Sequence, residues 1–256
     1  MTSSSAFADP TPRVGVMVIS HESHYLQECI ESVLSQSFRP DRIVVIDNGS
    51  PADASVSAVA LAYELDLIRI EKPMSASTAR NVGCVFLDDC EYIVNLDGDD
   101  VWLPEYLETY LGTAREERAD VVFGAAEVFG VEQGVWFTAA DRPESMDLRR
   151  GNFVPANSLF RRDLWWRVGG FDPALTYFED WDFWLSCAER SAVFRSVEQP
   201  LWRYRRHARS LMGASTHSSR DGARQYVREK HLRFIQGRLG WRRWKRNFEK
   251  YLLRRR

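Results

Sequence analysis

Apolar runs and helical patterns alternate along the first hundred residues of the chain. A short run of apolar residues predicts a strand buried on both faces, whereas apolar residues three and four positions apart predict a helix with one buried face. The strand-like runs cover residues 14–19, 42–46, 67–70 and 92–96. The helical patterns include one stripe of Leu26, Ile30, Val33 and Leu34, followed by residues 54–65 and 75–87. This order predicts a parallel sheet with helices on both faces.

The pattern is less regular after Pro104. We expect a helix over 105–115, strands near 121–123 and 135–137, helices near 161–168 and 180–189, and strands over 193–197 and 201–204. Repeats and low-complexity tracts are absent from the sequence. We interpret this half as a continuation of the same domain.

Two of the predicted strands end in aspartate. Asp47 follows the second strand, and Asp97 follows the fourth and begins the acidic run Asp97-Gly98-Asp99-Asp100. Ligands bind beyond the carboxyl ends of such strands, so we expect both aspartates at one rim. Crowded carboxylates repel one another unless a cation or hydrogen bonds compensate, and their oxygens suit Mg²⁺ or Mn²⁺. An acidic turn capping the helix near Pro104 is the alternative.

Composition and the absent phosphate loops narrow the function. Hydrophobic residues make up 45% and charged residues 27% of the chain, as in ordinary globular proteins. Neither G-x-x-x-x-G-K-[ST] nor G-x-G-x-x-G occurs, so a diphosphate bound here needs a cation to neutralise it. No apolar run approaches the roughly 20 residues that span a bilayer.

Six segments resemble those of one known family, in its order and at about its spacing. They are residues 14–36, 43–50, 79–83, 96–100, 169–172 and 178–182. Over about residues 14–210 the chain resembles inverting family-2 glycosyltransferases of the GT-A type. The resemblance implies an α/β GT-A fold, a mostly parallel central sheet flanked by helices. It also implies metal-dependent transfer of a sugar from a nucleotide-diphosphate sugar, with UDP-sugar favoured, to an acceptor hydroxyl in glycan or glycolipid biosynthesis.

The resemblance also assigns roles on the donor side. Asp47 is similar to the aspartate that hydrogen-bonds the nucleotide base, and Arg80 to the arginine beside the nucleoside. Asp97-Gly98-Asp99 matches the D-x-D motif, in which Asp97 faces the ribose or a metal-bound water and Asp99 binds Mn²⁺ or Mg²⁺. The sequence departs from the family after the first strand, where His21-Glu22 replaces the usual Tyr-Asn pair. Ser20 and Glu22 remain candidates for base and ribose contacts.

On the acceptor side, Asp180 matches the catalytic base. An inverting transfer needs one carboxylate to take the proton of the attacking hydroxyl, while the metal stabilises the leaving diphosphate. Glu179 is the neighbouring candidate, and the two side chains point in different directions on a helix, so only one faces the sugar. An acid-rich helix start is the alternative. His207 resembles a late family residue near the diphosphate and completes the metal shell, or else belongs to a solvated basic strand end.

The remaining conspicuous side chains have structural explanations. Trp181, Phe183 and Trp184 form either a platform for a sugar acceptor or part of the core, and core packing is favoured for aromatics at helical spacing. We expect the four cysteines to be buried thiols in a reducing, cytoplasmic compartment. They are Cys29, Cys84, Cys90 and Cys187.

The two ends of the chain differ from its body. We expect a disordered leader over 1–13, which lacks the features of a secretory signal. We interpret 14–236 as a single GT-A domain, with a nucleotide-binding half over 14–103 and an acceptor-side half over 104–236. From Arg238 to the end the balance of charge is +8, against −10 for the rest, so a nucleic-acid binder is disfavoured.

Residues 237–256 form a basic amphipathic tail. Within 240–256, Trp241, Trp244, Phe248 and Tyr251 or Leu252 share one helical face. We expect such a helix either to lie on the inner face of an anionic membrane, where it would serve a lipid-linked acceptor, or to pack on the domain; the acceptor is a saccharide or a lipid-linked one.

Two other functions compete with transfer. A catalytically degenerate GT-A module would bind partners without turnover, and it differs from an enzyme by the absence of metal-dependent UDP binding. A sugar-1-phosphate nucleotidylyltransferase needs a glycine-rich basic loop after the first strand, and His21-Glu22-Ser23-His24 is not such a loop.

Overall fold

The computed structural model of the chain describes residues 12–21, 24–51, 56–136, 147–208 and 217–236. The predicted leader (except its last two residues), Glu22 and the predicted tail over 237–256 lie outside the described residues. Within the described part, every helix is too short or too polar to cross a lipid bilayer.

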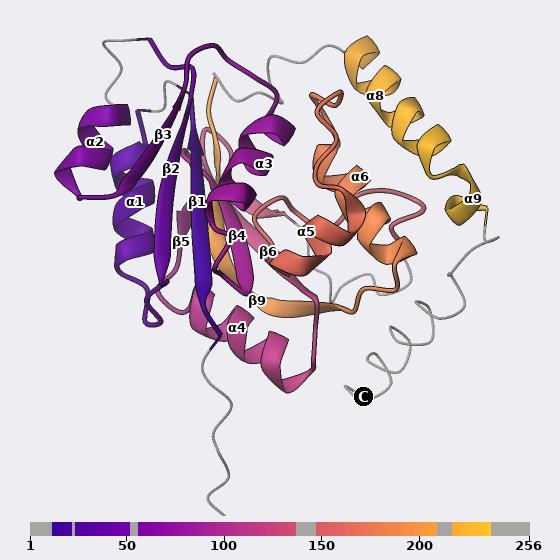
Figure 1. Cartoon of the computed structure of the whole chain (residues 1–256), viewed down its shortest axis with the longest axis horizontal. Coiled ribbons are helices and arrows are strands. Elements are labelled where there is room, and N and C mark those ends of the chain that lie inside the picture. The colour runs from indigo at the N-terminus through magenta and orange to yellow at the C-terminus, as the bar shows by residue number, and fades with distance from the viewer. Residues whose placement is uncertain (1–11, 22–23, 52–55, 137–146, 209–216, 237–256) are drawn as a thin grey trace, which may run out of the picture.

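The first half of the chain forms the predicted parallel sheet. Its strands are β1 (Val14–Ser20), β2 (Arg42–Asn48), β3 (Asp66–Ile70) and β4 (Tyr92–Asp97), in the spatial order β3-β2-β1-β4 (Figure 1). The connecting helices are α1 (Leu26–Leu34), α2 (Val56–Ala62) and α3 (Ala76–Phe86). α2 ends earlier than predicted, because Glu64 adopts a left-handed φ of 54° that breaks the helix. The alternation of strands and helices is therefore confirmed.

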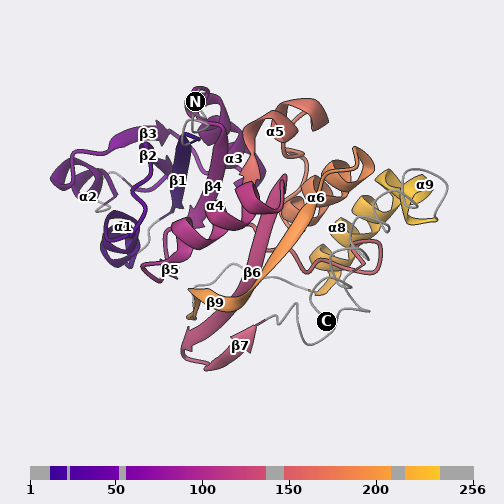
Figure 2. The same ribbon diagram turned by 90° about the horizontal axis from the view of Figure 1, so that it is seen from below.

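The same sheet continues into the second half of the chain, where it becomes mixed. The order beyond β4 is β8-β6-β9-β5, and β7 pairs with β6. β8 is antiparallel to β4 and β6, whereas β6 and β9 are parallel. The elements are β5 (Val101–Trp102), α4 (Tyr106–Glu116), β6 (Val121–Gly130), β7 (Gly134–Trp136), β8 (Leu159–Arg161), α5 (Arg162–Val168), α6 (Glu179–Glu189) and β9 (Phe194–Arg206). The parallel arrangement thus holds for residues 14–97, and within the described ranges nine strands share one sheet. Figure 2 shows β6 and β9 side by side, with β7 at the far end of β6.

β9 is one long strand where the sequence predicts two. Its ladder with β6 slips between Gly124 and Ala126, opposite the stretch that contains Pro200. Proline has no N–H for the ladder and is tolerated at such a bulge. A side chain at Gly124 would meet the Tyr110 hydroxyl at 2.5 Å, so glycine lets α4 lie close to the irregular ladder.

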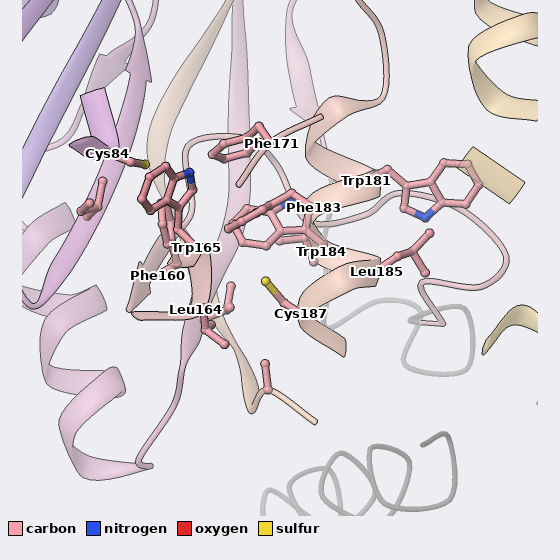
Figure 3. Close-up of a cluster of buried hydrophobic side chains, with 14 of the residues drawn as sticks. Cys84, Phe160, Leu164, Trp165, Phe171, Trp181, Phe183, Trp184, Leu185 and Cys187 are labelled. Carbon is pink, nitrogen blue, oxygen red and sulfur yellow. The ribbon is translucent and has the colours of Figure 1, made fainter. Parts of the chain in front are cut away.

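Apolar side chains cover both faces of the sheet. Along β1, Met17 joins one cluster, and Val16 and Val18 join the other, as the alternation of a strand requires. The first cluster contains side chains from α3, α5, α6 and β8, and Figure 3 shows its aromatic centre. Trp181, Phe183 and Trp184 are at most 1% exposed, so they belong to the core and not to an acceptor platform. All four cysteines are free and buried, as predicted.

Two helices near the end of the described chain pack beside α6. They are α8 (His217–Lys230) and α9 (Leu232–Ile235). The sequence patterns do not predict them, because α8 has few apolar residues and α9 is only four residues long. Lys230 and His231 hold the buried carboxylate of Asp182 on α6 at 2.9 and 3.0 Å. Figure 1 shows α8 and α9 on the outer side of α6. Charge pairing, with Val227 and Phe234 in the core, attaches this polar segment.

Candidate functional site

The carboxyl ends of β1, β2 and β4 form the edge on which the predicted donor residues meet. Ser20 on β1 is in register with Asp47 on β2, and Ile19 is in register with Asp97 on β4. The backbone N–H of Gly98 donates to the carbonyl of Ile19 at 2.8 Å. A side chain at Gly98 would lie 3.0 Å from that carbonyl and from Ser20 Cβ, so glycine allows the turn to pack against β1.

Asp47 and Ser20 present buried oxygens that lack a hydrogen-bond partner within the described part of the chain. Asp47 Oδ1 accepts hydrogen bonds from the backbone N–H and the hydroxyl of Ser50. Asp47 Oδ2 and Ser20 Oγ accept and donate none there, and Arg69 Nη1 lies 3.7 Å from Oδ2. Buried polar atoms are nearly always hydrogen-bonded in proteins, so these two atoms fit a polar ligand.

Arg80 connects this edge to α6. Its side chain is 3% exposed, with Nη1 2.5 Å from Glu179 Oε1 and Nη2 3.4 Å from Asp97 Oδ1. Burial lowers the pKa of Arg80, but Glu179 and then Asp97 outweigh that effect and hold the pKa above its ordinary value. The family resemblance places Arg80 beside a nucleoside; here it lies between two carboxylates, and its Nε has no hydrogen-bond partner among the described residues.

Asp180 lies in the first turn of α6, two residues after Phe178, whose φ of 61° turns the chain into the helix. Its Oδ2 accepts a hydrogen bond from Asn152 Nδ2 at 2.7 Å, and its Oδ1 accepts one from the backbone N–H of Trp181 at 2.8 Å. Burial, and then repulsion from Glu179, raise the pKa of Asp180 to about 7. A carboxylate with that pKa exchanges protons near neutral pH.

Glu179 and Asp180 contact different partners. Glu179 is paired with Arg80, whereas Asp180 is hydrogen-bonded to Asn152. The two side chains point in different directions, as expected of neighbouring residues on a helix. Glu179 forms an ion pair with Arg80, whereas Asp180 forms none within salt-bridge distance among the described residues.

Asp99 of the acidic turn pairs with His207, which follows β9, at this edge of the sheet. Asp99 Oδ2 lies 2.9 Å from His207 Nε2. Burial, and then repulsion from Asp97, raise the pKa of Asp99, while His207 partly offsets both. The carboxylate of Asp97 turns toward Arg80 and Asn95. The described residues contain no group of three or more His, Cys, Asp or Glu side chains placed to hold a metal.

The pair of Asp99 and His207 nevertheless fits a divalent cation that is shared with a phosphate ligand. Mg²⁺ in nucleotide sites usually has one or two protein carboxylates, with phosphates and water filling the other positions. A cation also relieves the repulsion among the acidic groups that raises the pKa of Asp99.

Arg205 and Asp100 hold the acidic turn in place. From the sequence, Asp100 is identified as part of the acidic run without a role of its own, and Arg205 is not identified. The backbone N–H of Arg205 donates to Asp100 Oδ1 at 2.9 Å, and its Nε donates to the Asp99 carbonyl at 2.8 Å. Its guanidinium lies 4.0 and 4.2 Å from the ring centroids of Tyr25 and Phe129. The sequence signals for these contacts were the basic strand end that precedes His207 and the third aspartate of the acidic run.

The alternative that the acidic run caps the following helix is wrong. α4 begins at Tyr106, and its N-cap residue Glu105 makes no side-chain capping hydrogen bond. Asp100 instead bonds β9, and Asp97 faces Arg80.

Comparisons with known proteins show the family and the fold of the chain. The model of Glycosyl transferase family 2 matches residues 16–174. The chain is 27% identical to YwdF of Bacillus subtilis (strain 168), an uncharacterized glycosyltransferase, over 194 residues, which are 72% of this chain and 70% of the relative. It is 28% identical to AmsE of Erwinia amylovora, an amylovoran biosynthesis glycosyltransferase, over 176 residues, 62% of each chain.

A solved structure shares the fold. S. aureus TarS 1-349 in complex with UDP-GlcNAc matches with a TM-score of 0.70 and 18% identity, over 80% of this chain and 61% of that one. The match supports the GT-A type of mixed α/β sheet flanked by helices. Together with the family model, which covers more than half of the chain, it leads to one conclusion: this chain belongs to glycosyl transferase family 2 and is a glycosyltransferase.

Proposed function

We propose that the chain is an inverting enzyme that uses Mn²⁺ or Mg²⁺ and transfers a sugar from a UDP-sugar to a hydroxyl of a saccharide or lipid-linked acceptor. The observation that carries the proposal is the chain of contacts Asp97–Arg80–Glu179, which links Asp180 to the edge that carries Asp47 and Asp99. A base next to a donor edge is the arrangement that direct displacement needs, because the hydroxyl must lose its proton where the sugar is held.

The donor side is suited to a uracil base. Asp47 Oδ2 is a buried acceptor, and the N3–H of uracil is a donor of the matching kind. The complex of TarS with UDP-GlcNAc supports a uridine donor, and the name of AmsE supports a role in glycan synthesis. Asp97 and Gly98 lie beside this edge, where the ribose and diphosphate would follow the base.

In the proposed reaction, the acceptor oxygen attacks the anomeric carbon while Asp180 takes its proton. The bond from that carbon to the diphosphate oxygen breaks, UDP leaves with the electron pair, and the anomeric configuration inverts. A cation bound by Asp99 and His207 would supply positive charge that stabilises the leaving diphosphate. Arg80 pairs with Glu179 and Asp97, whereas Asp180 has no cationic partner at salt-bridge distance among the described residues and is therefore the carboxylate of this pair that we assign to accept the proton.

Donor binding tests the proposal directly. We expect UDP-GlcNAc or another UDP-sugar with Mn²⁺ to raise the melting temperature, because a ligand of the folded state stabilises it by mass action. GDP- and dTDP-sugars serve as comparison donors. If no nucleotide-sugar raises the melting temperature with or without Mn²⁺, the donor site proposed here is wrong.

Asp47→Asn is the matched variant for the base contact. Ser50 donates to Oδ1 through both its N–H and its hydroxyl, so the amide keeps its oxygen there and places its NH₂ where Oδ2 was. A donor would then face the uracil N3–H. We expect the affinity for UDP, measured by calorimetry, to fall about tenfold or more, since an unpaired buried donor costs about 1–3 kcal/mol. An unchanged affinity would exclude Asp47 from base recognition.

The pH dependence of transfer follows from Asp180. The base works only when ionised, and burial raises its pKa to about 7, so activity is lost as the pH falls through that value. We expect kcat/KM to rise about tenfold per pH unit below the pKa and to level off above it. The initial rate of UDP release at saturating Mn²⁺ measures this profile. A profile that stays flat between about pH 5 and 8 would contradict the role of Asp180.

A further inference from the structure

The side chain of Asn152 contacts the proposed base Asp180, and Asn152 belongs to no motif of the family resemblance. Its Nδ2 donates to Asp180 Oδ2 at 2.7 Å, across 28 positions of the sequence. Asp180 Oδ1 is held independently by the backbone N–H of Trp181. Each oxygen of the carboxylate therefore has one donor, and the two donors come from different segments of the chain.

The orientation of Asn152 is itself determined. Its Oδ1 accepts a hydrogen bond from the backbone N–H of Val154 at 3.2 Å, and Val154 is fully buried in the core. The amide therefore directs its NH₂ group, and not its oxygen, to Asp180. A second contact fastens the same segment to α6, because Trp181 Nε1 donates to the Leu148 carbonyl at 2.7 Å.

We propose that Asn152 is a positioning residue for the catalytic base: its amide holds the carboxylate of Asp180 in one orientation and favours the ionised form. The inference rests on the proposed role of Asp180. A hydrogen bond from a donor to a carboxylate favours the charged state, and this one acts against the burial that favours the neutral state. A merely structural Asn152 would fasten residues 147–154 to α6 and would leave the protonation of Asp180 unchanged.

The other charges that face Asp180 remain the same when Asn152 is replaced. They are Glu179 on the same helix, which raises the pKa of Asp180, and Arg80 on α3, which lowers it. Both are held in their own ion pair and do not contact Asn152 at hydrogen-bonding distance in the described residues. A change in the titration of Asp180 therefore reports the loss of the amide donor.

Two substitutions at Asn152 and one control separate the roles. Asn152→Ala removes the donor, and Asn152→Asp replaces it with a carboxylate of nearly the same shape. Leu148→Ala is the control, because it deletes a buried side chain from the same segment and leaves the hydrogen bond to Asp180 in place. The readout is a ¹³C NMR titration of aspartate carboxyl carbons in the whole, ligand-free protein, with the Asp180 signal identified by its absence from Asp180→Asn.

We expect the titration midpoint of Asp180 to rise by about one pH unit in Asn152→Ala. The hydrogen bond from Asn152 stabilises the ionised carboxylate, and the free energy of such a bond corresponds to a pKa change of about that size. In Asn152→Asp the rise should be larger, since two carboxylates then share the site and titrate as a coupled pair. Leu148→Ala should melt at a lower temperature with the midpoint unmoved. An unmoved midpoint in Asn152→Ala would overturn the proposal.

An activity measurement distinguishes failure of this inference from failure of the proposed function. Hydrolysis of UDP-GlcNAc is followed by UDP release with Mn²⁺ present. Asn152→Ala should be several-fold slower than wild type near pH 7 and should approach it near pH 9, where the base is ionised in both. If the wild type releases no UDP from any UDP-sugar while the midpoints still shift, the proposed function fails and the effect of Asn152 on Asp180 stands. A uniform loss at all pH values would instead assign Asn152 a purely structural role.

Discussion

Asp180→Asn is expected to slow sugar transfer by about a thousandfold while the affinity for UDP-sugar changes by less than about twofold. The amide cannot take the proton of the acceptor hydroxyl, and the side chain lies in the first turn of α6, apart from the Asp47 and Ser20 edge that would bind the base. Transfer is measured as UDP release with acceptor present, and donor affinity is measured by calorimetry in the presence of Mn²⁺.

The substitution also breaks one of two hydrogen bonds, because an amide accepts only through its single oxygen. We expect this to cost about 1 kcal/mol of unfolding free energy, which is small enough to leave the protein folded at assay temperature. Asp221→Asn, an exposed position on α8, is the matched control and should retain full activity. If Asp180→Asn keeps more than about a tenth of the wild-type rate, the base is another group, and Glu179→Gln is the next variant to measure.

Asp99→Ala should abolish the dependence of donor binding on Mn²⁺ and should reduce kcat/KM by about a hundredfold or more. Among the residues that the structure describes, no group of three or more ligating side chains is placed to hold a cation, and Asp99 is the carboxylate that lies beside His207. With so few protein ligands, loss of the Asp99 carboxylate should strongly reduce the affinity of the protein for the cation. The measurement is UDP-sugar affinity at increasing Mn²⁺, together with initial rates.

Asp88→Asn is the control for this experiment, because Asp88 is exposed after α3 and ahead of β4, whereas the acidic turn follows the other end of that strand. It should bind UDP-sugar and Mn²⁺ as the wild type does. A chelator should reduce the wild-type rate and leave Asp99→Ala unaffected. Equal stimulation of Asp99→Ala and wild type by Mn²⁺ would show that the cation binds elsewhere.

The hydrophobic pattern was sufficient for the parallel half of the fold. β1 and β4 are buried on both faces, so their sequences are nearly continuous apolar runs that are difficult to mistake. The second half depends on contacts that no local pattern contains. β8 has only three residues, and its pairing with β4 and β6 stabilises it as a strand. α8 is attached to α6 through Lys230 and His231, whose partner Asp182 is some fifty positions away in the sequence.

For the candidate site, the sequence indicated the residues that stand in motifs but not the long-range partners that hold them. Asp47, Asp97 and Asp180 stand in recognisable motifs, and the structure places them on elements that meet at one side of the sheet or are joined through Arg80. Arg80 itself lies in a motif, but its pairing with Glu179 spans 99 positions and has no local signal. Asn152 stands in an irregular segment without periodicity, so only its three-dimensional contact with Asp180 reveals it.

The hydrogen bonds of Arg205 to the acidic turn limit how far the chain can be shortened before activity is lost. The family model's match ends at residue 174, ahead of α6 and of β9. A fragment cut there would lack Asp180, and it would also release the Asp99-Asp100 turn, whose carbonyl and carboxylate are held by a residue about a hundred positions downstream. We therefore expect the active unit to extend through His207, because a truncation designed on the family boundaries alone would lack the proposed base and the Arg205 contacts to the acidic turn.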